Sequence, residues 1–322
     1  MSTAPMKCAV IGAGNMGKNH VRVYSQLPAV QLVGVADLNE ELGAFFVDKY
    51  AITYYKDFKE MLTKERPEMV SVCVPTLYHH QVASYCLNQG IHVLLEKPIA
   101  MTVEQGQSLI DTAKSNNVKL LTGHIERFNP AVQKVKDMLN KNELGKVINI
   151  MARRVGGFPP QIRDADIAVD LAIHDVDIVN YLLDEIPLKV VAHKQRNLIE
   201  ERDDAVTFFM EYKQASSYIQ ANWVTPVKIR KLTITGTEGY LEVDYVNQKI
   251  EFYKSHYDRY KESEGDYSDY ILCFSEPDII TISVAKKEPL REEILYFLNC
   301  IRNNLTVSSD FALEALKIVT AN

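Results

Sequence analysis

The sequence has no long hydrophobic run. No stretch approaches the about 18 consecutive apolar residues that a membrane-spanning helix requires. The opening residues, MSTAPMKCAVIGAG, lead directly into a strand pattern without the apolar segment of a signal peptide. We therefore expect a soluble, cytoplasmic protein that makes no membrane contact.

Paired cysteines and an excess of positive charge are also missing. The five cysteines are scattered and none belongs to a C-x-x-C pair, which favours reduced thiols in the core. The net charge of -6 at pH 7 gives no electrostatic reason to bind nucleic acid. No tight spacing of histidines, cysteines and carboxylates indicates a metal site. These absences leave a small soluble molecule as the expected partner.

Two regimes of hydrophobic patterning divide the chain of 322 residues. From residue 6 to about 122, short apolar runs such as EMVSVCVP alternate with amphipathic segments. This alternation predicts βαβ units and a parallel sheet with helices on both faces. After about residue 146, strands joined by short turns predict a large, open and mostly antiparallel sheet. The expected fold class is an α/β domain followed by an α+β domain.

Helical patterns interrupt and close the second half of the chain. They cover residues 170–183 and 289–303, and residues 310–320 form a closing amphipathic helix behind an acidic cap candidate. We place the boundary between residues 1–122 and residues 123–322, with the closing helix free to pack back on the first domain. A broad antiparallel sheet needs its second face covered, so we expect a homodimer or a homotetramer.

The first functional motif is the segment VIGAGNMGKNH, which contains G-x-G-x-x-G between an apolar strand and a helical pattern. Asp37 ends the next strand, at the spacing typical of a dinucleotide site in a Rossmann domain. Its carboxylate can accept hydrogen bonds from both ribose hydroxyls and would repel a 2′-phosphate, so NAD is favoured over NADP. The alternative is a glycine turn without a ligand. The cofactor-binding residues expected here are Gly12, Gly14, Asn15, Met16, Gly17 and Asp37.

Polar residues follow two further strands of the predicted parallel sheet. Pro75, Thr76 and His79 come after the strand in EMVSVCVP, and Glu96 and Lys97 come after the strand in IHVLLEKP. Ligands of open α/β sheets bind outside the carboxyl ends of the strands, so we expect all five residues near the cofactor. The alternatives are structural. Thr76 would cap a helix with His79 in its first turn, and the glutamate and lysine would form a salt-bridged turn.

The third motif, DLAIHDVD, places Asp170, His174 and Asp177 on one stripe of a helix. An imidazole in a cleft can remove a hydroxyl proton near neutral pH, and Asp170 can orient the ring or relay the proton. The alternative is a helix cap at Asp170 and a core histidine at His174.

Together these motifs resemble the glucose-fructose oxidoreductase/inositol 2-dehydrogenase family (Gfo/Idh/MocA). The resemblance includes G-x-G-x-x-G, E-K-P at residues 96–98, RFNP at 127–130 and D-x-x-x-H-x-x-D at 170–177, in order along the chain. It implies oxidation or reduction of sugar or cyclitol carbons with NAD(P). It also implies that Lys97 faces the nicotinamide, that His174 and Asp170 lie across from it, and that the Lys97–Pro98 bond is cis.

These implied roles agree with the chemistry of alcohol oxidation. A base must take the hydroxyl proton while a cation stabilises alkoxide character on the same oxygen. We assign His174 as the base and Lys97 as the hydrogen-bond donor. The two roles are exchanged if burial and the positive nicotinamide favour a neutral lysine.

The segments GHIERFNPAV and ARRVGGFPPQIRD resemble the branch of that family that oxidises nucleotide sugars. The expected substrate is UDP-N-acetylglucosamine, and the keto product would pass to a pyridoxal-phosphate aminotransferase. Arginines with fixed forks suit a diphosphate, and Arg127, Arg154 and Arg163 are the candidates, with Arg153 as an alternative to its neighbour. Two other functions stay open, a dehydrogenase of a free sugar or cyclitol and a non-catalytic NAD-dependent regulatory protein.

Overall fold

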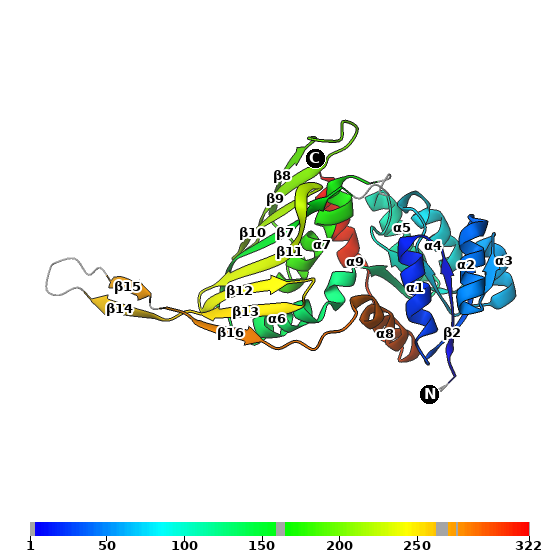
Figure 1. The fold of residues 1–322 in the computed structure, drawn as a ribbon, viewed down its shortest axis with the longest axis horizontal. Helices are drawn as coiled ribbons and strands as arrows, with labels where there is room; N and C mark the ends of the chain where they lie inside the picture. Colours follow the sequence, from blue (N-terminus) through cyan, green and yellow to red (C-terminus); the bar gives the residue numbers. More distant parts are fainter. Residues whose placement is uncertain (1–3, 159–164, 262–269, 275, 322) are drawn as a thin grey trace. The chain divides into compact units, whose positions relative to one another are not determined.

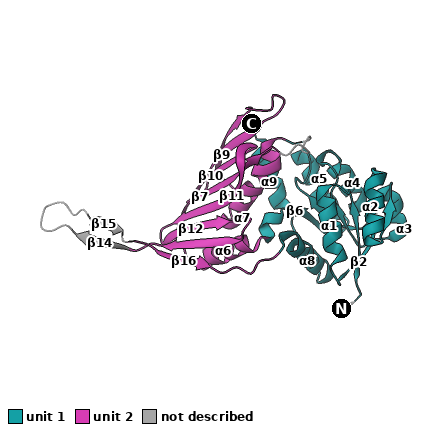
Figure 2. Cartoon of the chain, viewed as in Figure 1, with its two compact units in different colours: residues 1–128, 162–165, 288–321 teal, residues 129–161, 166–287, 322 magenta. Residues whose placement is uncertain are grey.

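A computed structural model describes residues 4–158, 165–261, 270–274 and 276–321, without the side chains of residues 257–274. The chain forms two compact units (Figure 2), the first made of residues 1–128, 162–165 and 288–321, the second of residues 129–161, 166–287 and 322. The sequence pattern places residues 123–322 in the second domain and leaves the closing helix, residues 310–320, free to pack back on the first. In the structure, residues 288–321 belong to the first unit, together with the few residues that follow position 122.

The first unit is built on a six-stranded sheet with the order β3-β2-β1-β4-β5-β6 (Figure 1). Every neighbouring pair is parallel, which confirms the predicted α/β architecture. The strands are β1 (Met6–Ile11), β2 (Val30–Ala36), β3 (Thr53–Tyr55), β4 (Met69–Val72), β5 (His92–Glu96) and β6 (Leu120–Gly123).

Both faces of this sheet are buried, because alternate strand residues point to opposite sides. In β1, Cys8 and Val10 join a core with side chains of α1 and α8, while Ala9 and Ile11 are equally buried on the other face. The helices of the unit are α1 (Asn15–Ser25), α2 (Glu40–Tyr50), α3 (Phe58–Glu65), α4 (His79–Asn88), α5 (Val103–Ser115), α8 (Pro289–Arg302) and α9 (Asp310–Thr320), with short 3-10 turns η1 (Thr76–Tyr78) and η2 (Ile125–Phe128).

The second unit contains an eight-stranded sheet with the order β16-β13-β12-β11-β7-β10-β9-β8. All neighbouring pairs are antiparallel except β7 and β10, which run parallel. The mostly antiparallel prediction is therefore confirmed. The strands are β7 (Val147–Gly157), β8 (Lys189–Gln195), β9 (Ala205–Glu211), β10 (Ser216–Asn222), β11 (Val224–Gly236), β12 (Gly239–Asp244), β13 (Lys249–Lys254) and β16 (Asp278–Ile282).

One face of the eight-stranded sheet packs against helices and the other is open. In β7, Ile150, Ala152 and Arg154 are buried, whereas Met151 and Arg153 point to the exposed face. The buried face contacts α6 (Pro130–Asn140) and α7 (Ile173–Leu183), and α7 is preceded by a π-helical turn, η3 (Ala168–Ala172).

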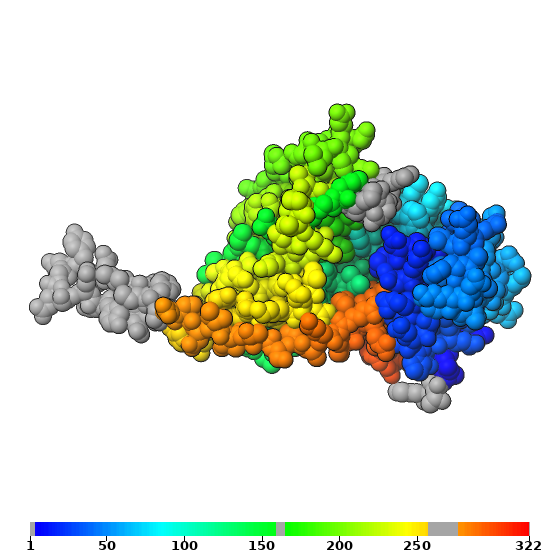
Figure 3. Space-filling model, in the orientation of Figure 1, coloured from blue at the N-terminus to red at the C-terminus, as the bar shows by residue number. Residues whose placement is uncertain are grey.

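Two further strands, β14 (Tyr257–Lys261) and β15 (Tyr270–Phe274), form a separate antiparallel hairpin between β13 and β16. Strand β16 pairs only along β13 within the described part of the sheet. The segment that contains β16 is visible in orange on the surface (Figure 3), and Ile279 and Ile280 are exposed. None of the described helices is long and apolar enough to cross a membrane.

Candidate active site

The glycine loop after β1 is packed tightly on the end of β4. Gly12 has a φ of 92°, a conformation that side chains disfavour, and a Cβ placed there would lie 2.6 Å from the carbonyl carbon of Cys73. A Cβ at Gly17 would lie 1.9 Å from the carbonyl oxygen of Gly12. These two glycines therefore allow a tight turn and close contact between the loop and α1.

Gly14 serves a different purpose, because a Cβ built there would meet nothing within 4 Å. It is the N-cap of α1, and no side chain caps this helix end. Asn15 is exposed and Met16 half-buried in the first turn. Amides at a helix N-terminus have no partner within the helix and attract anions. The open space beside Gly14 and these amides fit the pyrophosphate of a dinucleotide.

Asp37 connects the end of β2 to the glycine loop. Its Oδ2 accepts a hydrogen bond from the Ala13 amide at 2.6 Å, and its Oδ1 accepts one from the Asn39 amide at 2.8 Å. Each carboxylate oxygen has a second lone pair for a ribose hydroxyl. The Asn39 side chain caps α2 through the amides of Glu41 and Leu42. Asp37 thus lies where the sequence predicts the ribose-binding acid.

The segment after β4 departs from the prediction at one residue. Pro75 is exposed and Thr76 is half-buried within η1, so Thr76 is not its N-cap. The His79 side chain is buried, and its Nδ1 and Nε2 lie 2.8 and 2.9 Å from the carbonyl oxygens of Pro98 and Val74. His79 therefore ties the end of β4 to the E-K-P loop. Its position matches the structural alternative, a histidine in the first turn of α4, and its contact with the cofactor stays a prediction.

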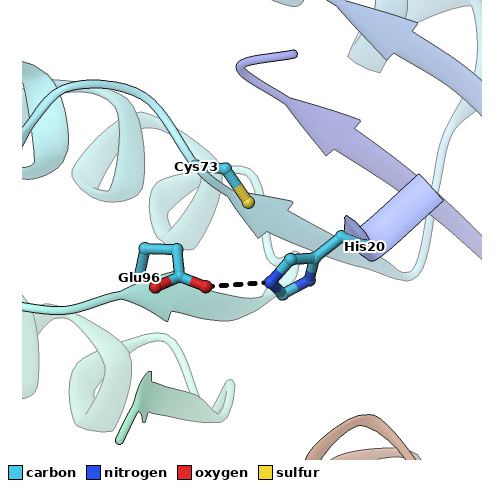
Figure 4. A group of neighbouring side chains, drawn as sticks. All are labelled: His20, Cys73 and Glu96. Carbon is cyan, nitrogen blue, oxygen red and sulfur yellow. Dashed lines mark hydrogen bonds and ion pairs between the residues drawn. The ribbon is translucent and has the colours of Figure 1, made fainter. Parts of the chain in front are cut away.

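The E-K-P loop after β5 turns its two charged residues to different surroundings. The Lys97–Pro98 peptide bond is cis, as the resemblance implies, and Lys97 is half-buried. Glu96 is buried, and its Oε1 lies 2.9 Å from His20 Nε2 (Figure 4). The Glu96 side chain is therefore an internal partner of α1. Its expected contact with the cofactor stays a prediction.

Burial and neighbouring charges determine the ionisation of this buried group. Burial raises the pKa of Glu96, but the hydrogen bond and charge of His20, with Lys97 and His79, outweigh it and leave that pKa below its ordinary value. For Cys73, burial and the nearby Glu96 and Glu293 raise the pKa well above the ordinary thiol value. At neutral pH the site therefore holds a carboxylate and a neutral thiol.

The sequence patterns missed His20 and Glu293. In the segment GKNHVRVYSQL, His20 precedes the buried Val23, Tyr24 and Leu27 at helical spacing, so it belongs to the apolar stripe of α1. An imidazole on such a stripe is the available signal for a buried polar contact. Glu293 has a similar position in α8, between Leu290 and Phe297.

In the second unit, the predicted helix at residues 170–183 begins as the π-helical turn η3, which contains Asp170. Asp166, rather than Asp170, caps this end, because its Oδ1 accepts the Val169 amide at 3.0 Å. His174 is half-buried in the first turn of α7, and Asp177 is buried. Turns of this type occur frequently at functional sites.

The predicted arginines have different environments. The guanidinium of Arg154 is buried and donates from Nε and Nη2 to the two oxygens of Asp175, at 2.8 and 3.0 Å. This fork makes Arg154 an internal partner of Asp175, and its contact with a diphosphate stays a prediction. Arg153 is exposed, and the Arg127 guanidinium stacks 3.7 Å from the centroid of the Phe311 ring. Arg163 lies outside the described residues.

Two family models match the chain. The oxidoreductase family model with the NAD-binding Rossmann fold matches residues 6–124. The GFO/IDH/MocA C-terminal domain model matches residues 132–242.

Sugar and cyclitol dehydrogenases are among the known proteins with similar sequences and structures. UDP-N-acetylglucosamine 3-dehydrogenase from Acidithiobacillus ferrooxidans is 27% identical over 95% of this chain and 91% of its own length. A solved structure of the enzyme with that name from the same organism superposes with a TM-score of 0.85, at 26% identity, covering 98% of this chain and 96% of that one. A scyllo-inositol 2-dehydrogenase (NAD(+)) from Bacillus subtilis is 26% identical over 94% of this chain and 87% of its own length.

Proposed function

Because this chain belongs to the Gfo/Idh/MocA family of NAD-binding oxidoreductases, we propose that it oxidises carbon 3 of UDP-N-acetylglucosamine to the 3-keto sugar. The observation that carries the proposal is the similarity to UDP-N-acetylglucosamine 3-dehydrogenase along 95% of the chain. The glycine loop and the helix N-terminus beside Gly14, which fit a dinucleotide, support the redox part of it.

Three side chains of this protein share the steps of the reaction. NAD, when bound, supplies the acceptor for the hydride that leaves the carbon. His174 takes the hydroxyl proton, and Asp170 orients its ring. Lys97 donates a hydrogen bond to the same oxygen and stabilises its developing negative charge. Lys97 belongs to the first unit and the other two to the second.

NAD is the proposed cofactor because of the charge on Asp37. This carboxylate holds the Ala13 amide of the glycine loop and stands at the carboxyl end of β2. A 2′-phosphate at that end of the strand would be repelled by it. Comparing the binding of NADH and NADPH by fluorescence tests the choice, and NADPH binding as tight as NADH binding would refute it.

Diphosphate recognition is assigned to Arg127 and Arg163. The Arg127 guanidinium lies 3.7 Å from the centroid of the Phe311 ring, and a planar guanidinium can bind a phosphate through two parallel hydrogen bonds. The 3-keto product has the carbonyl that a pyridoxal-phosphate aminotransferase converts to an amine, so we propose such an enzyme as the pathway partner.

The test is NADH formation from UDP-N-acetylglucosamine, compared with myo-inositol, glucose and UDP-N-acetylglucosaminuronic acid. His174→Ala is expected to lower kcat by about 10²–10⁴-fold because it removes the general base. His193→Ala, which changes an exposed histidine of the same unit, serves as the control and should retain full activity. Turnover of UDP-N-acetylglucosamine that survives in His174→Ala would remove His174 from the mechanism.

A dehydrogenase of a free cyclitol or sugar is the second candidate. It is favoured by the similarity to scyllo-inositol 2-dehydrogenase over 94% of the chain, and by the internal ion pair that withdraws Arg154 from substrate binding. Turnover of myo-inositol or glucose without UDP-sugar turnover would select it. NADH binding without turnover of any of these substrates would favour a regulatory binding protein.

A further inference from the structure

A chain of buried hydrogen bonds lies directly behind the E-K-P loop. Tyr24 OH is 2.6 Å from Ser71 Oγ, Ser71 Oγ is 2.9 Å from His20 Nδ1, and His20 Nε2 is 2.9 Å from Glu96 Oε1. Tyr24 and His20 come from α1, Ser71 from β4 and Glu96 from β5, so the chain crosses the core of the first unit. All four side chains are buried.

All groups of this chain can be paired when Glu96 is ionised. A carboxylate accepts, so His20 Nε2–H donates to Glu96, while His20 Nδ1 pairs with the Ser71 hydroxyl. The Tyr24 hydroxyl pairs with Ser71 Oγ at the other end. Burial raises the pKa of Tyr24 well above its ordinary value, which keeps this first donor protonated. Every member is satisfied, as a buried polar network requires.

Other groups facing the network leave Glu96 as its single negative charge. Glu293, from α8, is fully buried, and burial and Glu96 raise its pKa well above the ordinary value, so it keeps its proton. Cys73, after β4, also stays protonated. The cationic neighbours are His20, Lys97 and His79, whose charges favour ionised Glu96. The Glu96 carboxylate and the positive charge of its chain neighbour Lys97 attract each other.

A metal site is the other interpretation of part of this group. Within the described residues, His20, Cys73 and Glu96 bring one possible ligand atom each to within 4.8 Å of one another (Figure 4). However, both ring nitrogens of His20 already have hydrogen-bond partners, Ser71 and Glu96. We therefore interpret the group as a hydrogen-bonded network.

We propose that His20 and Glu96 are positioning residues that hold Lys97 in place and in its ammonium form at the reacting carbon. The proposal rests on the function assigned above to Lys97. Glu96 and Lys97 are adjacent in the chain, so anchoring the glutamate side chain in the core fixes the backbone from which the lysine extends. The buried carboxylate supplies a constant negative charge behind the ammonium, where the surroundings screen it less than water does.

The first test measures Lys97 itself, without any substrate. Lysines are labelled by reductive ¹³C-methylation, the Lys97 signal is assigned by its loss in Lys97→Arg, and its titration is followed by NMR. In Glu96→Gln and His20→Leu, Lys97 is expected to lose its proton at a pH about one unit lower than in the wild type. His20→Gln is the matched control, because its amide can still donate to Glu96, and it should titrate like the wild type. Thermal unfolding of each variant establishes that it is folded.

The second test is the pH profile of kcat with the substrate identified above. In Glu96→Gln, the limb of the profile that belongs to Lys97 should move to lower pH, and kcat at alkaline pH should fall about tenfold if the lysine acts as donor. Rescue by His20→Gln, with a KM for NAD near the wild-type value, would separate positioning from loss of fold.

The two tests distinguish the possible failures. A Lys97 titration unchanged in folded Glu96→Gln would overturn the inference, even if the protein oxidises UDP-N-acetylglucosamine. A shifted titration in a protein that oxidises none of the substrates would support the effect on Lys97 and refute the proposed function instead.

Discussion

At the scale of single residues, the three glycines of the first loop have separable functions. Gly12 and Gly17 are required by the fold, because a Cβ at either would overlap backbone atoms. Gly14 has space for a Cβ and the ordinary φ of -63°, so the fold does not require a glycine there. A glycine at this position instead leaves room for a ligand that approaches the backbone closely.

This separation predicts opposite results for two alanine substitutions. Gly14→Ala should leave Tm unchanged and weaken NADH binding by about tenfold or more, or about 1.4 kcal/mol, because its methyl group enters the pyrophosphate position. Gly17→Ala should destabilise the protein by at least about 1–3 kcal/mol through overpacking. Calorimetry and NADH fluorescence check both. Unchanged NADH binding in Gly14→Ala would contradict the proposed placement of the cofactor.

The residue scale also shows where sequence reasoning succeeds and where it fails. The spacing from the glycine motif placed Asp37 after β2, and the carboxyl-end rule placed Lys97 after β5, where the structure has them. The same rule also selected Glu96 and His79, whose side chains instead point into the protein. Successive residues at a strand end point in opposite directions, and their directions depend on core partners such as His20, which lie far away in the sequence.

At the scale of elements, the ion pair of Arg154 and Asp175 joins β7 to α7. Their side chains are 6% and 1% exposed. Burial removes water from both charged groups, so the guanidinium and the carboxylate each need the other as an interaction partner. The Arg154 guanidinium also lies 5.2 Å from the centre of the Tyr245 ring.

Removing one partner of this pair should lower the free energy of unfolding more than removing both partners. Arg154→Met is expected to lower the free energy of unfolding of the second unit by about 3–5 kcal/mol, because Asp175 is left buried and uncompensated. Arg154→Met combined with Asp175→Leu should recover most of that loss. Urea unfolding followed by circular dichroism measures both variants. A double variant less stable than the single one would show that the helix needs Asp175 for another reason.

The buried carboxyl group of α8 gives a prediction with a defined pH dependence. Burial and Glu96 raise the pKa of Glu293 well above its ordinary value of 4.5, so at a pH between these values the folded protein keeps a proton that the unfolded chain has lost. The contribution of Glu293 to the free energy of unfolding is therefore fully present below about pH 4.5, and it is lost as the pH rises towards the raised pKa. Glu293→Gln removes this penalty, so the Tm of the variant should exceed the wild-type Tm by an increasing amount as the pH rises above about 4.5.

Glu292→Gln is the control for this prediction, because Glu292 is on the same helix and half-buried. The Tm of this variant should show no such trend. A Tm difference independent of pH would mean that Glu293 is ionised in the folded protein.

Elements with strong local patterns were predictable, and those set by partners were not. Residues 310–320 form α9 as predicted, because the apolar stripe and the acidic start are local features. The π-helical turn before α7 and the parallel pairing of β7 with β10 depend on long-range packing. The short β3, with only three residues, carries too little alternation to be recognised.

At the scale of the whole molecule, the chain returns to its first unit after completing its second. Residues 288–321 add α8 and α9 to the unit that residues 1–128 begin. The amphipathic patterns of these helices predict that they pack, but a periodic apolar face does not identify which core receives it. The predicted second domain therefore contained two helices that belong to the first unit.

The open face of the eight-stranded sheet carries a row of apolar side chains. Val191, Phe209, Tyr218 and Met151 are direct neighbours across β8, β9, β10 and β7. Their side chains are 51%, 45%, 37% and 49% exposed. A contiguous apolar row on the exposed face of a sheet is typical of a surface that another protein covers.

We expect this row to lie in the interface of a homodimer or homotetramer. Phe209→Glu combined with Met151→Glu places two charges in the row and should reduce the molar mass in solution to that of a single chain, because burying unpaired charges is unfavourable. Light scattering after size-exclusion chromatography measures the mass. Leu198→Glu, which changes an exposed leucine in the β8–β9 connection, is the control and should leave the assembly intact. An oligomer that persists in the double variant would place the interface elsewhere, and a monomeric wild type would leave the row for a different partner.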